Sequence, residues 1–186
     1  MDIKYRIEFF SNWHCGSGLA AGADVDALVV KDANGLPYVP GRTMKGLLRE
    51  SAQELGGDFN LFNRIFGLSG DKTTTNSEDK RIGECFFANA MLEEGAAIVA
   101  SGLTTYLFQT FASTAIDEKS GIAKDNSLRK IETVVPCILK GEINNVPDGG
   151  EELLRKAMKM IKRMGTGRNR GYGRCKISII NEKEDK

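Results

Sequence analysis

Apolar and polar residues alternate in two stretches near the ends of the chain. In residues 3–10 the charged positions are even-numbered and the odd positions apolar, which predicts a strand with one buried face. Residues 175–180 predict a last strand before a charged tail. Residues 83–92 predict a strand that is apolar on both sides and therefore covered on both faces. Residues 134–143 predict another, interrupted by Pro136, which favours a sheet edge or a bulge.

Helical periodicity marks two segments between these strands. Residues 40–55 place apolar side chains on one side and are followed by two glycines that can end a helix. Residues 151–164 form the clearest helix, acidic near its start and basic near its end, as the helix dipole favours. A short helix is expected over residues 60–68, and the ambiguous residues 96–111 are interpreted as partly helical.

The order strand, helix, strand, strand, helix, strand is that of the α+β, ferredoxin-like βαββαβ fold. A common RNA-recognition module (RRM) uses the same four-stranded sheet, so the core is RRM-like, although that module's aromatic signature is missing from this sequence. We expect one domain over residues 1–186. Its insertions are residues 11–41, with an irregular hairpin inside them, a mobile polar loop at residues 71–80, and a polar hairpin at residues 116–133.

Composition narrows the cellular setting and the kind of partner. The 186 residues are 41% hydrophobic with a net charge of +1, so binding to nucleic acid would depend on local basic patches. Four widely spaced cysteines and a single histidine argue against a structural zinc site and favour reduced thiols in the cytoplasm. No apolar run approaches the length that spans a membrane, so no membrane partner is expected.

Candidate chemistry concentrates in residues 165–174, which we call the glycine loop. Four of its ten residues are glycine and three are arginine. Glycine lets the backbone approach a ligand closely, and arginine offers a planar fork that matches phosphate, so the loop favours binding of a phosphate backbone. Its spacing and its place between a helix and a strand do not match the dinucleotide fingerprint. The alternative is a tight turn with no ligand.

The helix over residues 40–55 carries a second cationic feature. Arg42, Lys45 and Arg49 fall on one side of this helix, opposite its apolar face, and the neighbouring glutamates lie off the stripe. The alternative interpretation is an ordinary solvated surface, the commoner fate of charges on a helix. A uniformly positive stripe favours RNA binding, with this helix and the glycine loop as two walls of one groove.

Five stretches of the chain, taken in order, resemble the RAMP superfamily of CRISPR-associated proteins. They are residues 14–18, 26–32, 36–49, 62–67 and 165–174. Within that superfamily the chain is most similar to the repeated backbone subunit of type III effector complexes. The resemblance implies a subunit that polymerises along guide CRISPR RNA with other copies of itself and other effector subunits, and that engages target RNA.

The resemblance also implies roles for individual residues. The residues expected to contact RNA are His14, Arg42, Lys45, Arg49, Arg129, Gly165, Gly167, Arg168, Arg170, Gly171 and Tyr172. The polar hairpin corresponds to a thumb that kinks the guide–target duplex at about six-nucleotide intervals, and sequence preference should be weak because backbone contacts do not read bases. The chain departs from the family at Arg42 and Thr43, where two serines are usual, and at Thr166, where glycine is usual.

Asp26 corresponds to the aspartate that supports cleavage of target RNA, with Asp24 as an alternative carboxylate two residues away. Because an aspartate is a poor general base at neutral pH, Asp26 is expected to bind Mg²⁺ or another divalent cation, only when RNA is present. The 2′-hydroxyl would then attack the adjacent phosphate. Two alternatives stay open: a non-catalytic guide-binding subunit, and a guide-processing endoribonuclease that uses His14 as its acid or base.

Overall fold

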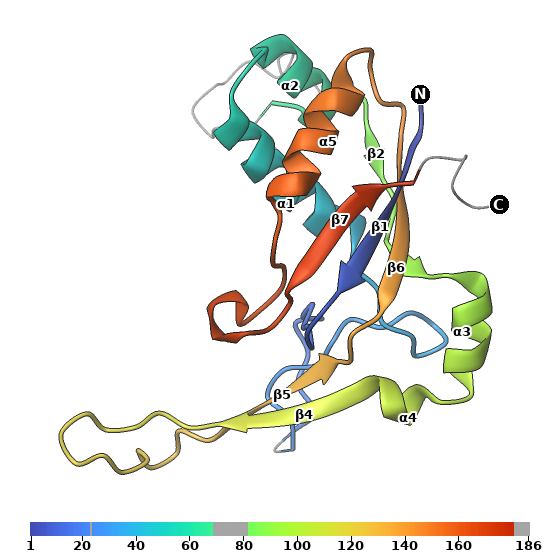
Figure 1. Ribbon diagram of the computed structural model, residues 1–186. Coiled ribbons are helices and arrows are strands. Elements are labelled where there is room, and N and C mark those ends of the chain that lie inside the picture. The colour runs from blue at the N-terminus through green and yellow to red at the C-terminus, as the bar shows by residue number, and fades with distance from the viewer. Residues whose placement is uncertain (23, 69–81, 181–186) are drawn as a thin grey trace.

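The computed structural model describes residues 1–22, 24–68 and 82–180 and is shown in Figure 1. Its elements in the first half of the chain are β1 (Ile3–Phe9), α1 (Gly41–Leu55), α2 (Phe59–Phe66), β2 (Phe86–Phe87), β3 (Met91–Leu92), α3 (Glu94–Ser101) and α4 (Thr104–Leu107). Those that follow are β4 (Phe108–Ser113), β5 (Arg129–Val134), β6 (Ile138–Asn144), α5 (Gly150–Met160), the 3₁₀ turn η1 (Arg168–Arg170) and β7 (Cys175–Ile179).

The main sheet has β1 at its centre, antiparallel to β6 on one side and to β7 on the other. The short strands β2 and β3 both pair with the far side of β6. Helices α1, α2 and α5 lie on one face of this sheet (Figure 1). The strand order and the helices confirm the ferredoxin-like α+β fold that the sequence predicts.

The core lies between the sheet and the helices because each element is apolar on the side that faces the other. The four odd-numbered positions of β1 are buried, as the alternation predicts. On α1 the buried side chains include Met44 and Leu48, and on α5 they include Leu154 and Met158. The expected helix over residues 60–68 is present as α2.

The polar hairpin is longer than the sequence predicts. Strands β4 and β5 form a separate two-stranded sheet, so the hairpin spans residues 108–134 instead of 116–133 and projects from the body of the protein (Figure 1). Residues 96–111, interpreted as partly helical, divide into α3, α4 and the start of β4. The pattern misleads here because β4 is exposed along most of its length and shows no buried face.

The prediction of one continuous, buried strand over residues 83–92 is wrong. This stretch contains the short strands β2 and β3, each of two residues, and Phe86 in β2 is 63% exposed. Between them the chain turns toward α1: Ala90 pairs with Val39, and the Gly41 N–H donates to the Asn89 side-chain oxygen at 2.9 Å. The Asn89 side chain thus accepts a hydrogen bond from one backbone donor at the start of α1. Asn89 itself does not pair with β6, so the pairing of this segment with β6 is interrupted.

Two further boundaries differ from the sequence prediction. Residues 134–143 are not one edge strand: Val134 ends β5, β6 begins at Ile138 inside the main sheet, and Pro136 lies in the connection. Helix α5 ends at Met160 instead of residue 164, because residues 162–163 pair with residues 174–175. The irregular hairpin before α1 is present as a bridge between Lys31 and Pro37. The polar loop at residues 71–80 lies outside the described residues.

One buried polar group at the sheet centre gives a test of the fold. The Tyr5 side chain lies opposite Gly141, where a Cβ would come within 2.4 Å of the Tyr5 hydroxyl oxygen. Within the described residues this buried hydroxyl has no hydrogen-bond partner, and burial raises the pKa of Tyr5. Removing an unsatisfied buried polar group removes its desolvation cost.

We predict that Tyr5→Phe raises the free energy of unfolding by about 1 kcal/mol or more, measured by urea denaturation. Gly141→Ala is expected to lower it, because the new methyl group meets the tyrosine ring. A less stable Tyr5→Phe variant would show that the hydroxyl has a partner and would contradict this assignment.

Candidate nucleic-acid interface

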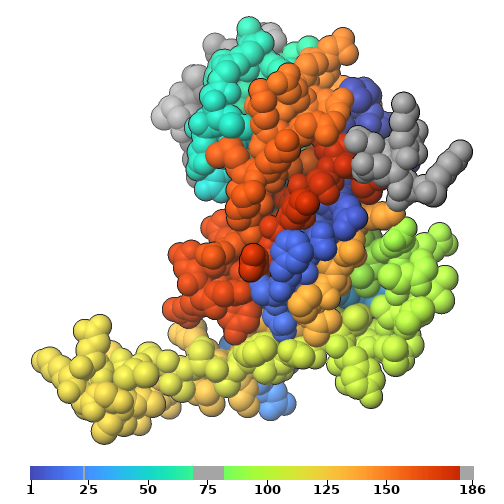
Figure 2. Space-filling view, in the orientation of Figure 1, coloured from blue at the N-terminus to red at the C-terminus, as the bar shows by residue number. Residues whose placement is uncertain are grey.

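An open groove of about 800 Å³ lies between the glycine loop and the β4–β5 hairpin. Its hairpin wall consists of Phe111, Ala112, Ser113, Arg129 and Ile131. Its loop wall consists of residues 165–170 and Tyr172. In Figure 2 the loop, in orange-red, lies beside the base of the hairpin, in yellow. The groove joins two segments that are far apart in the sequence.

The glycine loop has a backbone that only glycine adopts easily. Gly167 and Gly171 flank η1, and both have left-handed φ angles, of 74° and 90°. The turn between them leaves Arg168 and Arg170 exposed. The glycines therefore shape a compact turn that carries two guanidinium groups, as the sequence pattern predicts.

The loop is anchored on the backbone of residues 12–14. The Thr166 N–H donates to the His14 carbonyl oxygen at 2.9 Å, and the Gly173 N–H donates to the Asn12 carbonyl oxygen at 2.8 Å. At Gly165 a Cβ would lie 2.2 Å from that His14 oxygen. The approach is so close that a side chain at this position would displace the loop.

The hairpin is anchored on the same backbone. Trp13 and Val134 exchange both backbone hydrogen bonds, at 3.0 and 2.8 Å. The Asn12 amide donates to the Gln109 side-chain oxygen and to the Thr133 hydroxyl. Residues 12–14 therefore hold both walls of the groove at a fixed separation.

An aromatic pair crosses between the walls. The rings of Phe111, on β4, and Tyr172, on the loop, meet edge to face with centroids 5.6 Å apart. Gly167 makes room for this contact, because a Cβ there would lie 2.8 Å from the Tyr172 ring. Phe111 is not among the residues predicted from the sequence, because it lies in the ambiguous stretch before the expected hairpin and no periodic pattern distinguishes it.

Positive charge in the groove comes from Arg129, Arg168 and Arg170. Within the described part of the chain, none of these three guanidinium groups forms a salt bridge. The nearby Arg163 donates to the Arg168 carbonyl oxygen at 3.3 Å. The groove thus offers unpaired cations and aromatic surface together, a combination suited to a flexible phosphate backbone with attached bases.

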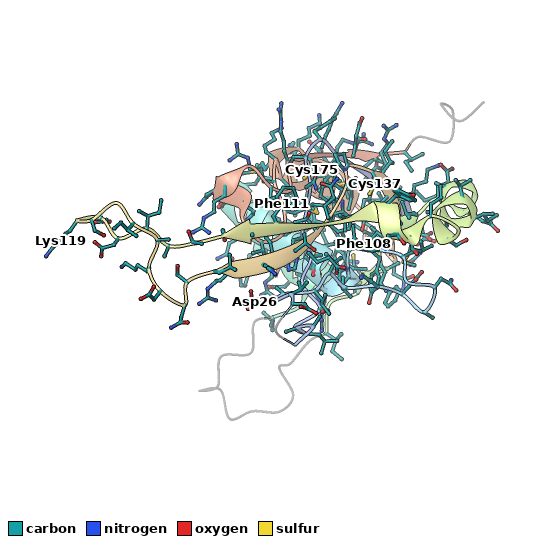
Figure 3. All side chains as sticks on the ribbon, turned by 90° about the horizontal axis from the view of Figure 1, so that it is seen from below. Asp26, Phe108, Phe111, Lys119, Cys137 and Cys175 are labelled. Atoms are coloured by element: carbon teal, nitrogen blue, oxygen red, sulfur yellow. The ribbon has the colours of Figure 1, made fainter. Side chains whose placement is uncertain are left out.

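Asp26 lies at the outer edge of β5 and does not line this groove. Its N–H donates to the Lys130 carbonyl oxygen at 2.8 Å, and its Oδ2 accepts from the Lys130 N–H at 2.7 Å. The next residue, Ala27, continues as a parallel bridge to Ile131. Figure 3 shows the exposed Asp26 side chain beside the hairpin.

No group of three His, Cys, Asp or Glu side chains that could hold a metal occurs among residues 1–22, 24–68 and 82–180. Asp26 by itself offers one exposed carboxylate. That donor set fits a hydrated cation held by one carboxylate together with water and RNA phosphate, and it does not fit a resident metal ion.

Glu132 fastens the inserted segment that carries Asp26. Its Oε2 accepts from the Val29 N–H at 3.0 Å, and its Oε1 accepts from Lys31 at 2.8 Å. The Lys31 ammonium also lies 4.0 Å from the centre of the Phe108 ring. The insertion is therefore fixed along the length of β5.

The cations of α1 lie outside this groove. Arg42 is exposed, Lys45 lies 6.0 Å from the centre of the Phe87 ring, and Arg49 lies 5.5 Å from the centre of the Phe62 ring. None of the three lines the groove. The groove is therefore formed by the glycine loop and the hairpin without α1, and the expectation that α1 and the loop bind RNA together stays a prediction.

His14 is buried, with a side chain exposed to only 3%. Its Nδ1 lies 2.6 Å from the Glu132 carbonyl oxygen, within hydrogen-bond distance. The histidine therefore joins the insertion to β5, and contact between its ring and RNA stays a prediction.

The sequence matches the family model of the RAMP superfamily over residues 6–176. The chain belongs to the RAMP superfamily. The solved structure of a type III-B Cmr-beta complex bound to cognate target RNA contains a chain with the same fold as this RAMP protein. The TM-score is 0.73 and the identity 9%, over 96% of this chain and 97% of that one. No curated protein matches the sequence. None of the helices among the described residues is long and apolar enough to cross a membrane.

The close contact at Gly165 predicts a stability difference within the loop of this RAMP protein. Gly165→Ala introduces both an unfavourable positive φ, of 84°, and a clash with His14. Gly171→Ala introduces the unfavourable φ alone, because nothing lies within 4 Å of its Cβ position. We predict a loss of about 1–2 kcal/mol in the free energy of unfolding for Gly171→Ala and a clearly larger loss for Gly165→Ala. Equal losses in urea denaturation would contradict the anchoring role of Gly165.

Proposed function

We propose that this RAMP protein is a guide-RNA-binding backbone subunit of a type III CRISPR ribonucleoprotein. The observation that carries the proposal is the groove between the glycine loop and the hairpin, with an aromatic pair and three guanidinium groups that form no salt bridge to any described residue. Family membership and the fold shared with a chain of a complex bound to target RNA support it. Guide RNA, target RNA, further copies of the chain and other effector subunits are its proposed partners.

The groove suits the backbone of single-stranded RNA. Guanidinium groups of Arg168 and Arg170 can each bind two phosphate oxygens, and Arg129 approaches from the opposite wall. Tyr172 and Phe111 offer ring surface to bases without reading their edges. Binding should therefore depend on RNA length and salt more than on sequence.

The projecting hairpin is the proposed thumb. Near its tip Ile116, Ile122 and Leu128 are all more than half exposed, so the hairpin offers several apolar side chains to a ligand. Apolar side chains of this kind can wedge between stacked bases and kink a duplex. Figure 3 shows the hairpin tip, marked by Lys119, far from the body of the protein. Repeated subunits would then kink the guide–target duplex at regular intervals.

Cleavage of the target is the proposed activity at Asp26. The exposed carboxylate lies beside the hairpin, where a kinked target strand would pass. When bound, a hydrated Mg²⁺ would neutralise charge on the scissile phosphate. Asp26 would hold this hydrated ion beside the phosphate, because its carboxylate alone would repel the phosphate, while the hairpin would hold the strand in line. The 2′-oxygen then bonds to phosphorus, the bond to the 5′-oxygen breaks, and the 2′-proton is transferred to that leaving oxygen, which leaves a cyclic phosphate.

A non-catalytic guide-binding subunit is the second candidate, because Asp26 already has a structural hydrogen bond to the Lys130 N–H. A guide-processing enzyme that uses His14 is less well supported. Its imidazole is buried and lies within hydrogen-bond distance of the Glu132 carbonyl oxygen, so it is poorly placed to exchange protons with RNA.

Arg168→Ala is predicted to weaken binding of single-stranded RNA and to flatten its salt dependence by about 0.7 in the log–log slope, because one phosphate contact is lost. Fluorescence anisotropy at several salt concentrations measures both quantities. Lys156→Ala is the matched control, since this lysine is paired with Glu152 on α5 and lies outside the groove. Equal effects of the two substitutions would rule out the groove as the RNA site.

Asp26→Asn is predicted to leave RNA binding and assembly intact, because the amide oxygen can still accept from the Lys130 N–H. Regularly spaced, Mg²⁺-dependent cuts in target RNA should slow by on the order of 100-fold, since a lost metal ligand costs several kcal/mol. Gel mapping of cuts by the reconstituted complex measures this. Unchanged cutting supports the non-catalytic alternative, and loss with Asp24→Asn instead would transfer the role to Asp24.

A further inference from the structure

Strand β7 forms an edge of the main sheet. On one side it pairs with β1, and no strand of the described chain pairs with its other side. Figure 1 shows this outer edge beside α5, away from the hairpin. An unpaired edge offers backbone donors and acceptors to a further strand.

The hydrogen bonds around β7 show which backbone groups point outward. The Cys175 N–H donates to the Lys162 carbonyl oxygen, on the outer side, and the Ile180 N–H donates to the Lys4 carbonyl oxygen of β1, on the inner side. Because backbone groups alternate along a strand, those of Ile177 and Ile179 point outward like those of Cys175. They have no backbone partner on that side among the described residues. Residues 162–163 cover only the start of the edge.

A hollow of about 230 Å³ lies along this open part, between α5 and β7. Its apolar floor is made by Met158, Ile161, Ile177 and Ile179. Arg155, Lys159 and Lys162 lie around this floor, and Lys176, next to Ile177 on the open edge of β7, carries its side chain on the opposite face of the sheet. The hollow therefore combines an apolar floor, a positive rim and a free strand edge.

The rim has an excess of unpaired positive charge. Arg155 is paired with Glu151 on the same helix. The ammonium groups of Lys159, Lys162 and Lys176 have no carboxylate within salt-bridge distance among the described residues. Since the whole chain carries a net charge of only +1, this concentration of cations is local. It favours an acidic ligand.

We propose that the outer edge of β7 binds an extended, acidic segment of another polypeptide by strand addition. The ligand's backbone would pair with Ile177 and Ile179, its apolar side chains would cover the floor, and its carboxylates would meet the lysines. RNA fits less well, because phosphates gain nothing from an apolar floor or from strand donors in register. A second copy of β7 fits poorly as well, because it would bring like charges together.

The test uses the full chain and a fluorescent peptide in which Glu and Val alternate. We expect saturable binding by anisotropy, weakened about tenfold or more by the double substitution Lys159→Glu and Lys176→Glu. Lys156→Glu is the matched control on the exposed side of α5, and it should change binding little. Two further peptides carry N-methyl groups at every second amide, one at the valines and the other at the glutamates. Only one of the two should lose binding, because strand addition uses the backbone donors of alternate residues.

Several results would overturn the proposal. The proposal is wrong if the peptide shows no saturable binding, or if the double substitution leaves its affinity unchanged. It is also wrong if N-methylation weakens binding equally at the valines and at the glutamates. Displacement of the peptide by single-stranded polyuridylate, together with an equal loss of RNA affinity in the double variant, would assign the surface to RNA. Arg168→Ala should leave peptide binding intact. A failure of the peptide-binding proposal can therefore be distinguished from a failure of the proposal that the groove binds RNA.

Discussion

The backbone of residues 12–14 is the constraint on which the candidate interface depends. It binds the glycine loop through the carbonyl oxygens of Asn12 and His14, and it binds the hairpin through the exchange between Trp13 and Val134. These are contacts between backbones, and they require particular side chains only where glycine permits close approach.

Sequence periodicity predicted the parts of the fold that bury one face. Strand β1 and helices α1 and α5 each have a buried side with regular spacing, and each was found close to its expected range. The hairpin was underestimated because β4 has no buried face. The division between β2 and β3 was missed because it results from a tertiary contact, the bond from Gly41 to Asn89, which leaves no periodic signal.

The candidate site was predictable in its chemistry and not in its geometry. The composition of the glycine loop predicted a turn that binds phosphate. The structure shows a compact turn that carries Arg168 and Arg170, and phosphate binding by this turn stays a prediction. Helical spacing showed which side of α1 is cationic, but spacing cannot show what lies opposite that side. Nor can residue type show burial: His14 has the chemistry of an acid or base, and the fold uses it as a structural link to Glu132.

The register of the hairpin connects RNA binding to the proposed cleavage. Arg129 and Ile131 line the groove, while the backbone of Lys130, between them, bonds to Asp26 on the outer edge of β5. A slip of one residue in the pairing of β5 would turn these side chains to the other face. The bonds from Trp13 to Val134 and from Asn12 to Thr133 prevent such a slip. The segment that sets the groove width therefore also fixes where Asp26 lies relative to the groove, which is the proposed RNA site.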